Sequence, residues 1–381
     1  MTHLPKIGLL GGGQLGRMLL QVAANWDLEV HVLDPNPEAP ARSLSPHFVR
    51  GDFSDYDTVY AFGQSLDLLT IEIEKVNTEA LLRLAREGKK VYPQPEIIAL
   101  IQDKRRQKAF YREAGIPTAD FLLTETRADV AQHLDFLPAF HKLGQGGYDG
   151  RGVQYLASPA DLPLAFEAPG LLEKAVAIHK ELAVLVARNP SGEVAVFPPV
   201  EMVFEPRLNL VDYLLSPAQI TPAQAQEAQL LARTLIEKWQ MVGLLAVEMF
   251  LTAEGQLLVN EVAPRPHNSG HASIEANYCS QFEQHLRAIL DWPLGNPASR
   301  QAAAMVNLLG EAGHQGPTYY EGLPEALGQP EAFVHLYGKK ITQPGRKMGH
   351  LTLLAENPAA LPSKVAWARQ VLKVKSTPLS E

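Results

Sequence analysis

The first hundred residues alternate between short apolar runs and longer stretches in which apolar positions recur at helical spacing. A short apolar run bounded by turn residues predicts a buried strand, whereas helical spacing predicts an amphipathic helix. Strands that alternate with helices are typical of a doubly wound parallel sheet, so we expect an α/β domain over residues 1–100. The predicted strands are 6–10, 29–33, 67–71 and 90–92, and the predicted helices are 14–24 and 78–87.

Beyond residue 100 the pattern becomes mixed, with short strands between fewer helices. A charged amphipathic helix is predicted over 103–114, because Gly115 and Pro117 stop it. A longer helix should begin at Thr221-Pro222, an N-cap followed by a proline at the first helical position, and end near Trp239. Further strands are expected at 182–186, 194–196, 244–251, 256–262, 332–337 and 350–354.

Composition excludes several classes of protein. The 381 residues are 46% hydrophobic and 20% charged, which suits a globular chain with a sizeable core and not a disordered one. A formal net charge of −8 argues against a nucleic-acid surface or an anionic membrane as the main partner. No apolar run approaches the ~20 residues that cross a bilayer. Cys279 is the only cysteine, which excludes an intrachain disulfide and fits a cytoplasmic location.

The glycines after the first strand indicate a phosphate site. Gly11-Gly12-Gly13-Gln14-Leu15-Gly16 fits the pattern G-x-G-x-x-G, and Asp34 ends the next strand where a ribose-binding acid is expected. Glycines let the backbone approach a phosphate, and the helix N-terminus offers free N–H groups and a positive dipole end. The motif alone fits a nicotinamide cofactor and other phosphorylated ligands, so both remain open.

A pair of carboxylates on a predicted hairpin indicates a metal. With a turn centred between Glu254 and Gly255, Glu248 faces Glu261, and the same register makes Phe250 face Val259. Two buried like charges require a proton or a cation, and Mg²⁺ prefers carboxylates together with substrate phosphates. A carboxylate pair on a solvated sheet face is the alternative.

A polar, proline-punctuated loop at 263–271 follows the second strand of this hairpin directly. Its Arg265 has the planar fork that holds a carboxylate or bicarbonate through two parallel hydrogen bonds. An ordinary polar turn is the simpler alternative, and a single histidine such as His267 is more often structural than functional.

These features, taken in their order along the chain, match two sets of motifs known from one family of enzymes. The broader set is Lys104, Lys142, Gly146–Gly152, Glu173-Lys174-Ala175-Val176, Glu181, Glu248, Asn260-Glu261 and Ala263–His271. The narrower set is Gly12–Met18, Glu72-Ile73-Glu74, Gly147–Gly150, Tyr337–Lys340 and Gly345–His350. The chain thereby resembles the ATP-grasp carboxylate–amine ligases, and among them the 5-(carboxyamino)imidazole ribonucleotide synthase family of purine biosynthesis.

The resemblance implies a fold, a reaction and partners. The fold would join the N-terminal doubly wound domain at 1–100 to a two-part ATP-grasp domain and a small C-terminal β-rich domain at 296–381. The ATP-grasp domain would consist of a small lid subdomain at 101–178 and a large subdomain at 179–295. The reaction would use ATP and Mg²⁺ to convert bicarbonate to carboxyphosphate. The amine of 5-aminoimidazole ribonucleotide would then capture the carboxyl group, directly or as CO₂. The family is a homodimer.

The resemblance also implies roles for individual residues. The residues implied to be catalytic are Lys142, Asp149, Arg265, His267 and Asn268. Those implied to bind ATP are Lys104, Lys142, Glu173, Lys174, Ala175, Val176, Glu181, Asn260 and Glu261, with Glu248 and Glu261 as metal ligands. Those implied to bind the imidazole nucleotide are Gly13, Gln14, Leu15, Glu74, Tyr148, Asp149, Arg151, Lys339, Arg346 and Lys347.

The sequence departs from the family pattern in two places. Leu143–Gly146 lacks the Thr-Arg pair expected after Lys142, and Glu201-Met202-Val203 only loosely matches the family's Glu-Asn-Val, so Glu201 is left out of the site. Three alternatives remain at this stage: a folate-independent formyltransferase of the same pathway, a nicotinamide-dependent oxidoreductase, and a non-catalytic nucleotide-binding regulator.

Overall fold

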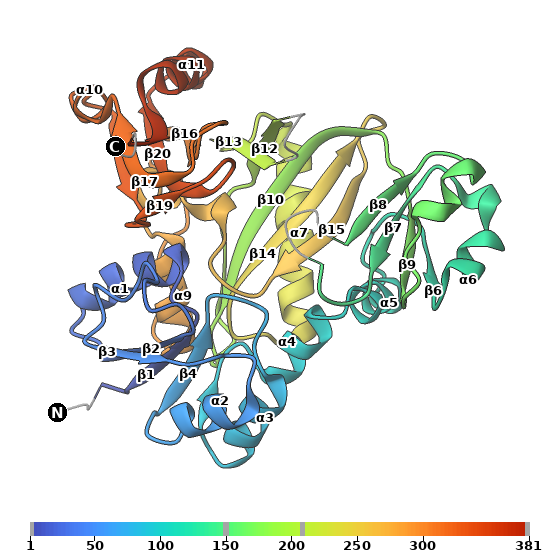
Figure 1. The fold of residues 1–381 in the computed structure, drawn as a ribbon, viewed down its shortest axis with the longest axis horizontal. Helices are drawn as coiled ribbons and strands as arrows, with labels where there is room; N and C mark the ends of the chain where they lie inside the picture. The colour runs from blue at the N-terminus through green and yellow to red at the C-terminus, as the bar shows by residue number, and fades with distance from the viewer. Residues whose placement is uncertain (1–3, 148–151, 206–209, 378–381) are drawn as a thin grey trace.

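The computed structural model describes residues 4–147, 152–205 and 210–377. Three parts surround a large central sheet: an N-terminal parallel sheet, a small antiparallel sheet that carries the lid, and a C-terminal layer of strands and helices (Figure 1). Within those ranges, no helix is both long and apolar enough to cross a membrane.

The N-terminal part is a five-stranded parallel sheet in the order β3-β2-β1-β4-β5, which confirms the predicted doubly wound domain. All residues of β1 and β4 are buried, as expected for strands covered on both faces. Helix α1 packs on one face together with α9 (Gln281–Ile289), which lies much later in the sequence. Helices α2 and α3 pack on the other face. The elements are β1 Ile7–Leu10, α1 Gln14–Asn25, β2 Val30–Asp34, β3 His47–Arg50, α2 Tyr56–Gly63, β4 Leu68–Ile71, α3 Thr78–Arg86, β5 Lys90–Val91 and α4 Pro95–Ile101.

The lid is a four-stranded antiparallel sheet in the order β6-β9-β7-β8, at the right of Figure 1. Helix α5 leads into it and ends at Gly115, whose left-handed φ of 68° closes the helix. The elements are α5 Lys104–Ala114, β6 Phe121–Thr124, α6 Arg127–Ala131, η1 Leu134–Phe136, β7 Ala139–Leu143, β8 Val153–Leu156, η2 Pro159–Leu164 and β9 Gly170–Lys174.

The central sheet runs in the order β15-β14-β10-β12-β13-β16-β20-β18, with β11 paired to β10. Helix α7 covers its first strands and forms the largest apolar core with them. The predicted start of α7 is confirmed, because the Thr221 side chain accepts from the N–H of Gln224 and Pro222 is the first helical residue. The elements are β10 Ile178–Arg188, β11 Val194–Val196, β12 Val200–Glu205, β13 Leu210–Ser216, α7 Pro222–Trp239, β14 Gly243–Thr252, β15 Leu257–Ala263, η3 Asn268–Gly270, α8 Ser273–Ala276 and α9 Gln281–Ile289.

The C-terminal part continues the central sheet and adds a small sheet of its own. Strand β16 pairs with β13, so the central sheet runs across the domain boundary that was predicted near residue 296. Helix α11 packs on β16 and β20, and a small sheet in the order β19-β17-β21 lies beside them. The elements are β16 Ala302–Leu309, β17 Gly316–Glu321, α10 Leu323–Leu327, β18 Ala332–Leu336, β19 Ile341–Thr342, β20 Lys347–Ala355, η4 Pro358–Ala360, α11 Leu361–Val371 and β21 Lys373–Ser376.

Candidate active site

The two hairpin carboxylates lie opposite each other. Glu248 on β14 is paired with Glu261 on β15, as the turn geometry predicts. The predicted pairing of Phe250 with Val259 is wrong, because the register shifts by one residue just beyond Glu248 and Phe250 faces Leu258. Asn260 is the additional residue at this β-bulge. A bulge re-aims the side chains beside it, and here Asn260 reaches to within 3.5 Å of the Lys142 ammonium.

The carboxylate pair is electrostatically unequal. Burial, together with the charges of Glu261 and Glu181, raises the pKa of Glu248. The Lys104 ammonium, whose Nζ lies 2.5 Å from Glu261 Oε2, lowers the pKa of Glu261. The Glu261 side chain is 45% exposed, so this side of the pair faces solvent and not the core. Glu248 and Glu261 form a donor set of oxygens that fits a hard divalent cation.

A buried ion triad holds the second predicted lysine. Lys142 Nζ lies 2.5 Å from one oxygen of Glu173, and Lys108 Nζ lies 2.6 Å from the other. The Glu173 side chain is 2% exposed, and although burial opposes its ionisation, the charges of Lys142 and Lys108 lower its pKa. Sequence reasoning missed Lys108. A signal was available, because Lys108 follows Lys104 by four residues and so shares its helix face.

The segment Glu173–Val176, which is predicted to bind ATP, is partly engaged by the protein itself. Glu173 sits in the central strand β9, and its side chain is taken by the two lysines. The N–H groups of Lys174 and Ala175 donate to the carbonyls of Asp120 and Pro138. Those two N–H groups are therefore not free donors, and a base at this strand end would have to use carbonyl groups or the Val176 backbone.

Glu181 lies on β10 beside the carboxylate pair. It is aligned with Phe250 on β14, two residues from Glu248. Burial and the nearby charge of Glu261 raise the pKa of Glu181 to about 7. A carboxyl group in this position gains from hydroxyl donors, which suits contact with a ribose.

The loop after β15 returns to the N-terminal sheet. Arg265 Nη2 lies 2.7 Å from Glu74 Oε1, just beyond β4, and Nη1 donates to the carbonyl of Pro266. Asn268 has both its side-chain oxygen and its nitrogen buried without a partner among the described residues. Buried amide atoms without partners are rare in native proteins, so Asn268 is poised for a ligand.

The tautomer of His267 follows from its hydrogen bonds. Its Nδ1 accepts from the N–H of Ser269, so the proton of the neutral ring is on Nε2, 3.4 Å from Glu248 Oε1. Burial and the charges of Arg265 and Lys347 lower the pKa of His267 to about 3, so the ring is neutral at physiological pH. His267 therefore presents an N–H donor beside the Glu248–Glu261 pair.

The glycine loop is closed by two carboxylates of the protein. Asp34 accepts from the N–H of Gly12 at 2.7 Å, and Glu72 accepts from the N–H groups of Gly13 and Gly16 at 2.7 and 2.8 Å. A Cβ at Gly13 would lie 2.8 Å from Glu72 Oε1, so the glycine makes room for this carboxylate. Burial raises the pKa of Glu72 to about 7, although the hydrogen bonds from the two N–H groups act to lower it.

This arrangement corrects two expectations about the glycine loop. Both oxygens of Asp34 already accept backbone N–H groups, from Gly12 and Asn36, so this carboxylate serves the loop itself and is less available to a ribose. The N–H of Gly13 is occupied as well, which leaves Gln14 and Leu15, at the start of α1, as the predicted phosphate donors of this loop. The role of Glu72 was missed, although the motif Glu72-Ile73-Glu74 pointed to this strand end.

Lys339 and Arg346, two cations predicted to bind the imidazole nucleotide, donate hydrogen bonds to backbone carbonyls. Lys339 Nζ donates to the carbonyl of Lys347 at 2.7 Å and lies over the ring of Tyr337. Burial and the charge of Arg346 lower the pKa of Lys339 to about 8. Arg346 Nη1 donates to the carbonyl of Ile341. These cations keep most of their hydrogen-bonding capacity for an anion.

Three predicted residues, Tyr148, Asp149 and Arg151, lie outside the described residues. The atypical segment before them is anchored, since the carbonyl of Gly144 accepts from the N–H of Lys104. The excluded Glu201 forms an ion pair with Lys180 at 2.7 Å on the neighbouring strands of the sheet.

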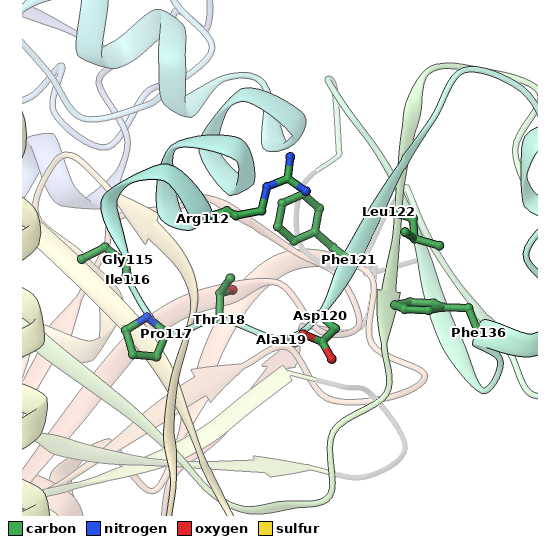
Figure 2. A pocket seen from close by; sticks show the side chains of 10 residues that line it. All are labelled: Arg112, Gly115, Ile116, Pro117, Thr118, Ala119, Asp120, Phe121, Leu122 and Phe136. Carbon is green, nitrogen blue, oxygen red and sulfur yellow. The ribbon is translucent and has the colours of Figure 1, made fainter.

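A pocket behind the lid does not belong to this cluster (Figure 2). Its walls come mainly from the connection between α5 and β6, where Arg112 lies over the ring of Phe121 at 4.8 Å, and from Phe136 opposite. The residues that line it include none of the predicted site residues, so we assign it no part in the reaction.

Comparisons with known proteins agree with this arrangement. Family models match residues 4–102 (ribonucleotide synthetase preATP-grasp domain), 109–282 (ATP-grasp domain) and 303–364 (phosphoribosylaminoimidazole carboxylase C-terminal domain). The N5-carboxyaminoimidazole ribonucleotide synthase of Synechococcus elongatus is 38% identical over 93% of this chain and 90% of its own length. The chloroplastic phosphoribosylaminoimidazole carboxylase of Vigna aconitifolia is 37% identical, over 94% of this chain but only 66% of its own length.

Solved structures show the same likeness. The crystal structure of N5-carboxyaminoimidazole ribonucleotide synthetase from Thermotoga maritima has a TM-score of 0.91 and 39% identity, over 98% of this chain and all of its own. The Aspergillus clavatus N5-carboxyaminoimidazole synthase, solved with ADP and 5-aminoimidazole ribonucleotide, has a TM-score of 0.88 and 35% identity over 97% of this chain and 99% of its own.

Proposed function

The chain belongs to the N5-carboxyaminoimidazole ribonucleotide synthase family, and on this premise we propose that it carboxylates the amine of 5-aminoimidazole ribonucleotide with ATP and bicarbonate. It is an ATP-dependent ligase of the ATP-grasp class. The observation that carries the proposal is the convergence of the Glu248–Glu261 pair with Lys104 and Lys142 beside the Arg265–Asn268 loop.

On the nucleotide side, Lys104 and Lys142 would neutralise the phosphates of ATP. Phosphoryl transfer needs positioning and charge stabilisation more than covalent help, and two ammonium groups supply both. Glu173 holds Lys142 until a phosphate competes for it. Glu181 would accept from the ribose, and the strand end at Lys174–Val176 would meet the base.

Glu248 and Glu261 would hold Mg²⁺, with the Asn260 amide beside them. The donor set fits, because burial and the repulsion from Glu261 and Glu181 raise the pKa of Glu248, and a divalent cation favours its ionised form. When bound, the metal supplies positive charge to the phosphate oxygens.

On the bicarbonate side, the Arg265 guanidinium, the His267 Nε2–H and the Asn268 amide would bind and orient the anion. An oxygen of bicarbonate attacks the γ-phosphorus of ATP, the bond to the bridging oxygen breaks, and ADP leaves as carboxyphosphate forms. The neutral state of His267 matters, because it can donate to the anion without transferring its proton.

On the imidazole side, the N–H groups of Gln14 and Leu15 would receive the nucleotide phosphate together with Lys339, Arg346 and Lys347. Glu74, which already orients Arg265, would accept from the amine or ribose. Tyr148 and Arg151 would meet the nucleotide, and Asp149 would accept the proton that the amine loses. The amine nitrogen attacks the carboxyl carbon, and inorganic phosphate leaves.

We further propose a homodimer that works in the cytoplasm.

An ADP-release assay with each substrate omitted in turn tests the function. Release should require ATP, Mg²⁺, bicarbonate and 5-aminoimidazole ribonucleotide together. Release that instead needs formate would indicate a formyltransferase, and NADH binding without MgATP binding would indicate an oxidoreductase. The capped glycine loop and the occupied Asp34 disfavour the oxidoreductase.

A further inference from the structure

Two histidines and a glutamate gather on the outer edge of the N-terminal sheet, away from the catalytic cleft. His31 on β2 is aligned with His47 on β3, and β3 is the edge strand of that sheet. Aligned residues on neighbouring parallel strands place their side chains on the same face, and Glu29, two residues before His31, shares that face. The regular geometry of the sheet therefore places the two histidines side by side, and Glu29 joins them from the position just before β2.

The distances between their ligand atoms are short. His31 Nε2 lies 2.7 Å from Glu29 Oε1, and one ligand atom from each residue lies within 4.8 Å of the other two. The rings of His31 and His47 stack with their centroids 4.4 Å apart. Zinc ligands at ~2.0–2.1 Å from the metal lie roughly 3.3 Å apart, so closure needs only side-chain rotation.

The position of the cluster separates it from the reaction. The neighbouring Val30 and Val32 point into the core against α1, so His31 faces away from that helix. The glycine loop, Asp34 and Glu72 lie at the carboxyl ends of β1, β2 and β4, whereas Glu29 and His31 lie at the amino end of β2. The side chains are accessible, since Glu29 is 39% and His31 19% exposed and His47 is exposed.

We propose that Glu29, His31 and His47 form a surface site for Zn²⁺, distinct from the magnesium site of the reaction. Two neutral imidazoles and one carboxylate are the ligands that zinc accepts, with water as the fourth, whereas Mg²⁺ disfavours imidazole. The site carries a built-in competitor, because Lys6 Nζ lies 3.5 Å from Glu29 Oε1. Zinc must displace this ammonium from the carboxylate.

The test measures Zn²⁺ bound per chain by equilibrium dialysis of the full-length protein, in buffer freed of transition metals and supplied with excess Mg²⁺ for the catalytic carboxylates. Wild type should bind one Zn²⁺ that His47→Gln and His31→Gln each lose. His179→Gln, which removes an exposed strand histidine outside the cluster, should keep it. Equal zinc content in wild type and His47→Gln would overturn the proposal.

The competing lysine gives a second test with the opposite sign. Lys6→Gln should lower the zinc dissociation constant, because the carboxylate of Glu29 no longer has a cation to release, whereas Glu29→Gln should raise it. Surface zinc bound without this geometry would respond to neither change. Wild-type affinity in both variants would remove Glu29 from the site and contradict the proposal.

Discussion

At the scale of single residues, the site depends on charges that the protein alone does not balance. Glu248 and Glu261 face each other with an ion pair from Lys104 to Glu261 alone, and Asn268 is buried with both amide atoms unpaired among the described residues. Groups arranged in this way lower the stability of the empty protein and gain when a cation or an anion arrives.

The first prediction concerns the charge on Glu261. Glu261→Gln should reduce ATP turnover by more than ~100-fold, because a metal-ligating carboxylate contributes several kcal/mol in the transition state. The fold should persist, since the side chain is half exposed. Steady-state ADP release and circular dichroism check both parts. Glu254→Gln at the exposed hairpin tip is the matched control, and equal activity of the two variants would remove Glu261 from metal binding.

The second prediction concerns Lys108, which sequence reasoning missed. Lys108→Met leaves Lys142 as the only cation on buried Glu173, so a phosphate must compete for Lys142 against a stronger carboxylate partner. We expect a raised KM for ATP with a smaller change in kcat, and a loss of about 1–3 kcal/mol in stability from the weakened buried pair. Lys108→Arg keeps the charge and should recover most of the stability. An unchanged KM for ATP in Lys108→Met would contradict the competition.

At the scale of elements, local rules predicted what depends on local sequence. The start of α7 followed from Thr221 and Pro222, and the pairing of Glu248 with Glu261 followed from the position of the turn. The bulge at Asn260 could not be predicted, because it depends on how β15 fits β14 and not on either strand alone. Strand β3 was missed because its residues are largely exposed and carry no apolar alternation.

Contacts between distant segments were equally invisible in the sequence. Glu72 accepts hydrogen bonds from glycines that lie 56 and 59 residues away in the sequence. Glu173 forms its ion pair with Lys108 across a similar separation. No periodicity links such positions. The family motifs predicted most of the strand ends that form the site. They could not predict which backbone N–H groups are already bonded to acceptors of the protein itself.

The third prediction concerns α9, which His285 joins to two sheets. His285 Nδ1 accepts from the N–H of Leu244 on β14, so Nε2 carries the proton and bonds Thr70 on β4 at 2.9 Å. Burial lowers the pKa of His285 to about 3. The unfolded chain binds a proton below about pH 6.5 that the folded chain does not, so this site loses stability as the pH falls below that value.

The stability advantage of wild type over His285→Gln should therefore shrink on acidification, by up to about 1.4 kcal/mol per pH unit. Denaturant unfolding at a series of pH values measures the difference. His179→Gln, at an exposed position, provides the control and should show no such slope. A constant difference between wild type and His285→Gln would mean that the folded protein keeps this imidazole protonated like the unfolded chain.

At the scale of the whole molecule, the site is built from parts that lie far apart in the sequence. Lys142 comes from the lid, Lys104 from α5 and the carboxylates from the central sheet. Glu74, just beyond β4 of the N-terminal sheet, joins through its pair with Arg265. A ligand that touches several of these groups joins the parts, so its binding free energy adds to the stability of the folded chain.

The last prediction uses this linkage. A ligand that binds only the folded state adds about 2.7 kcal/mol at a hundred times its dissociation constant, so ADP with Mg²⁺ should raise the melting temperature. Part of the increase should vanish with a chelator, because the carboxylate pair needs the metal to face phosphates. In Glu261→Gln the metal-dependent part should be lost while ADP alone still stabilises through Lys104 and Lys142. A metal-dependent increase as large in Glu261→Gln as in wild type would place the cation elsewhere, even if the enzyme carries out the proposed reaction.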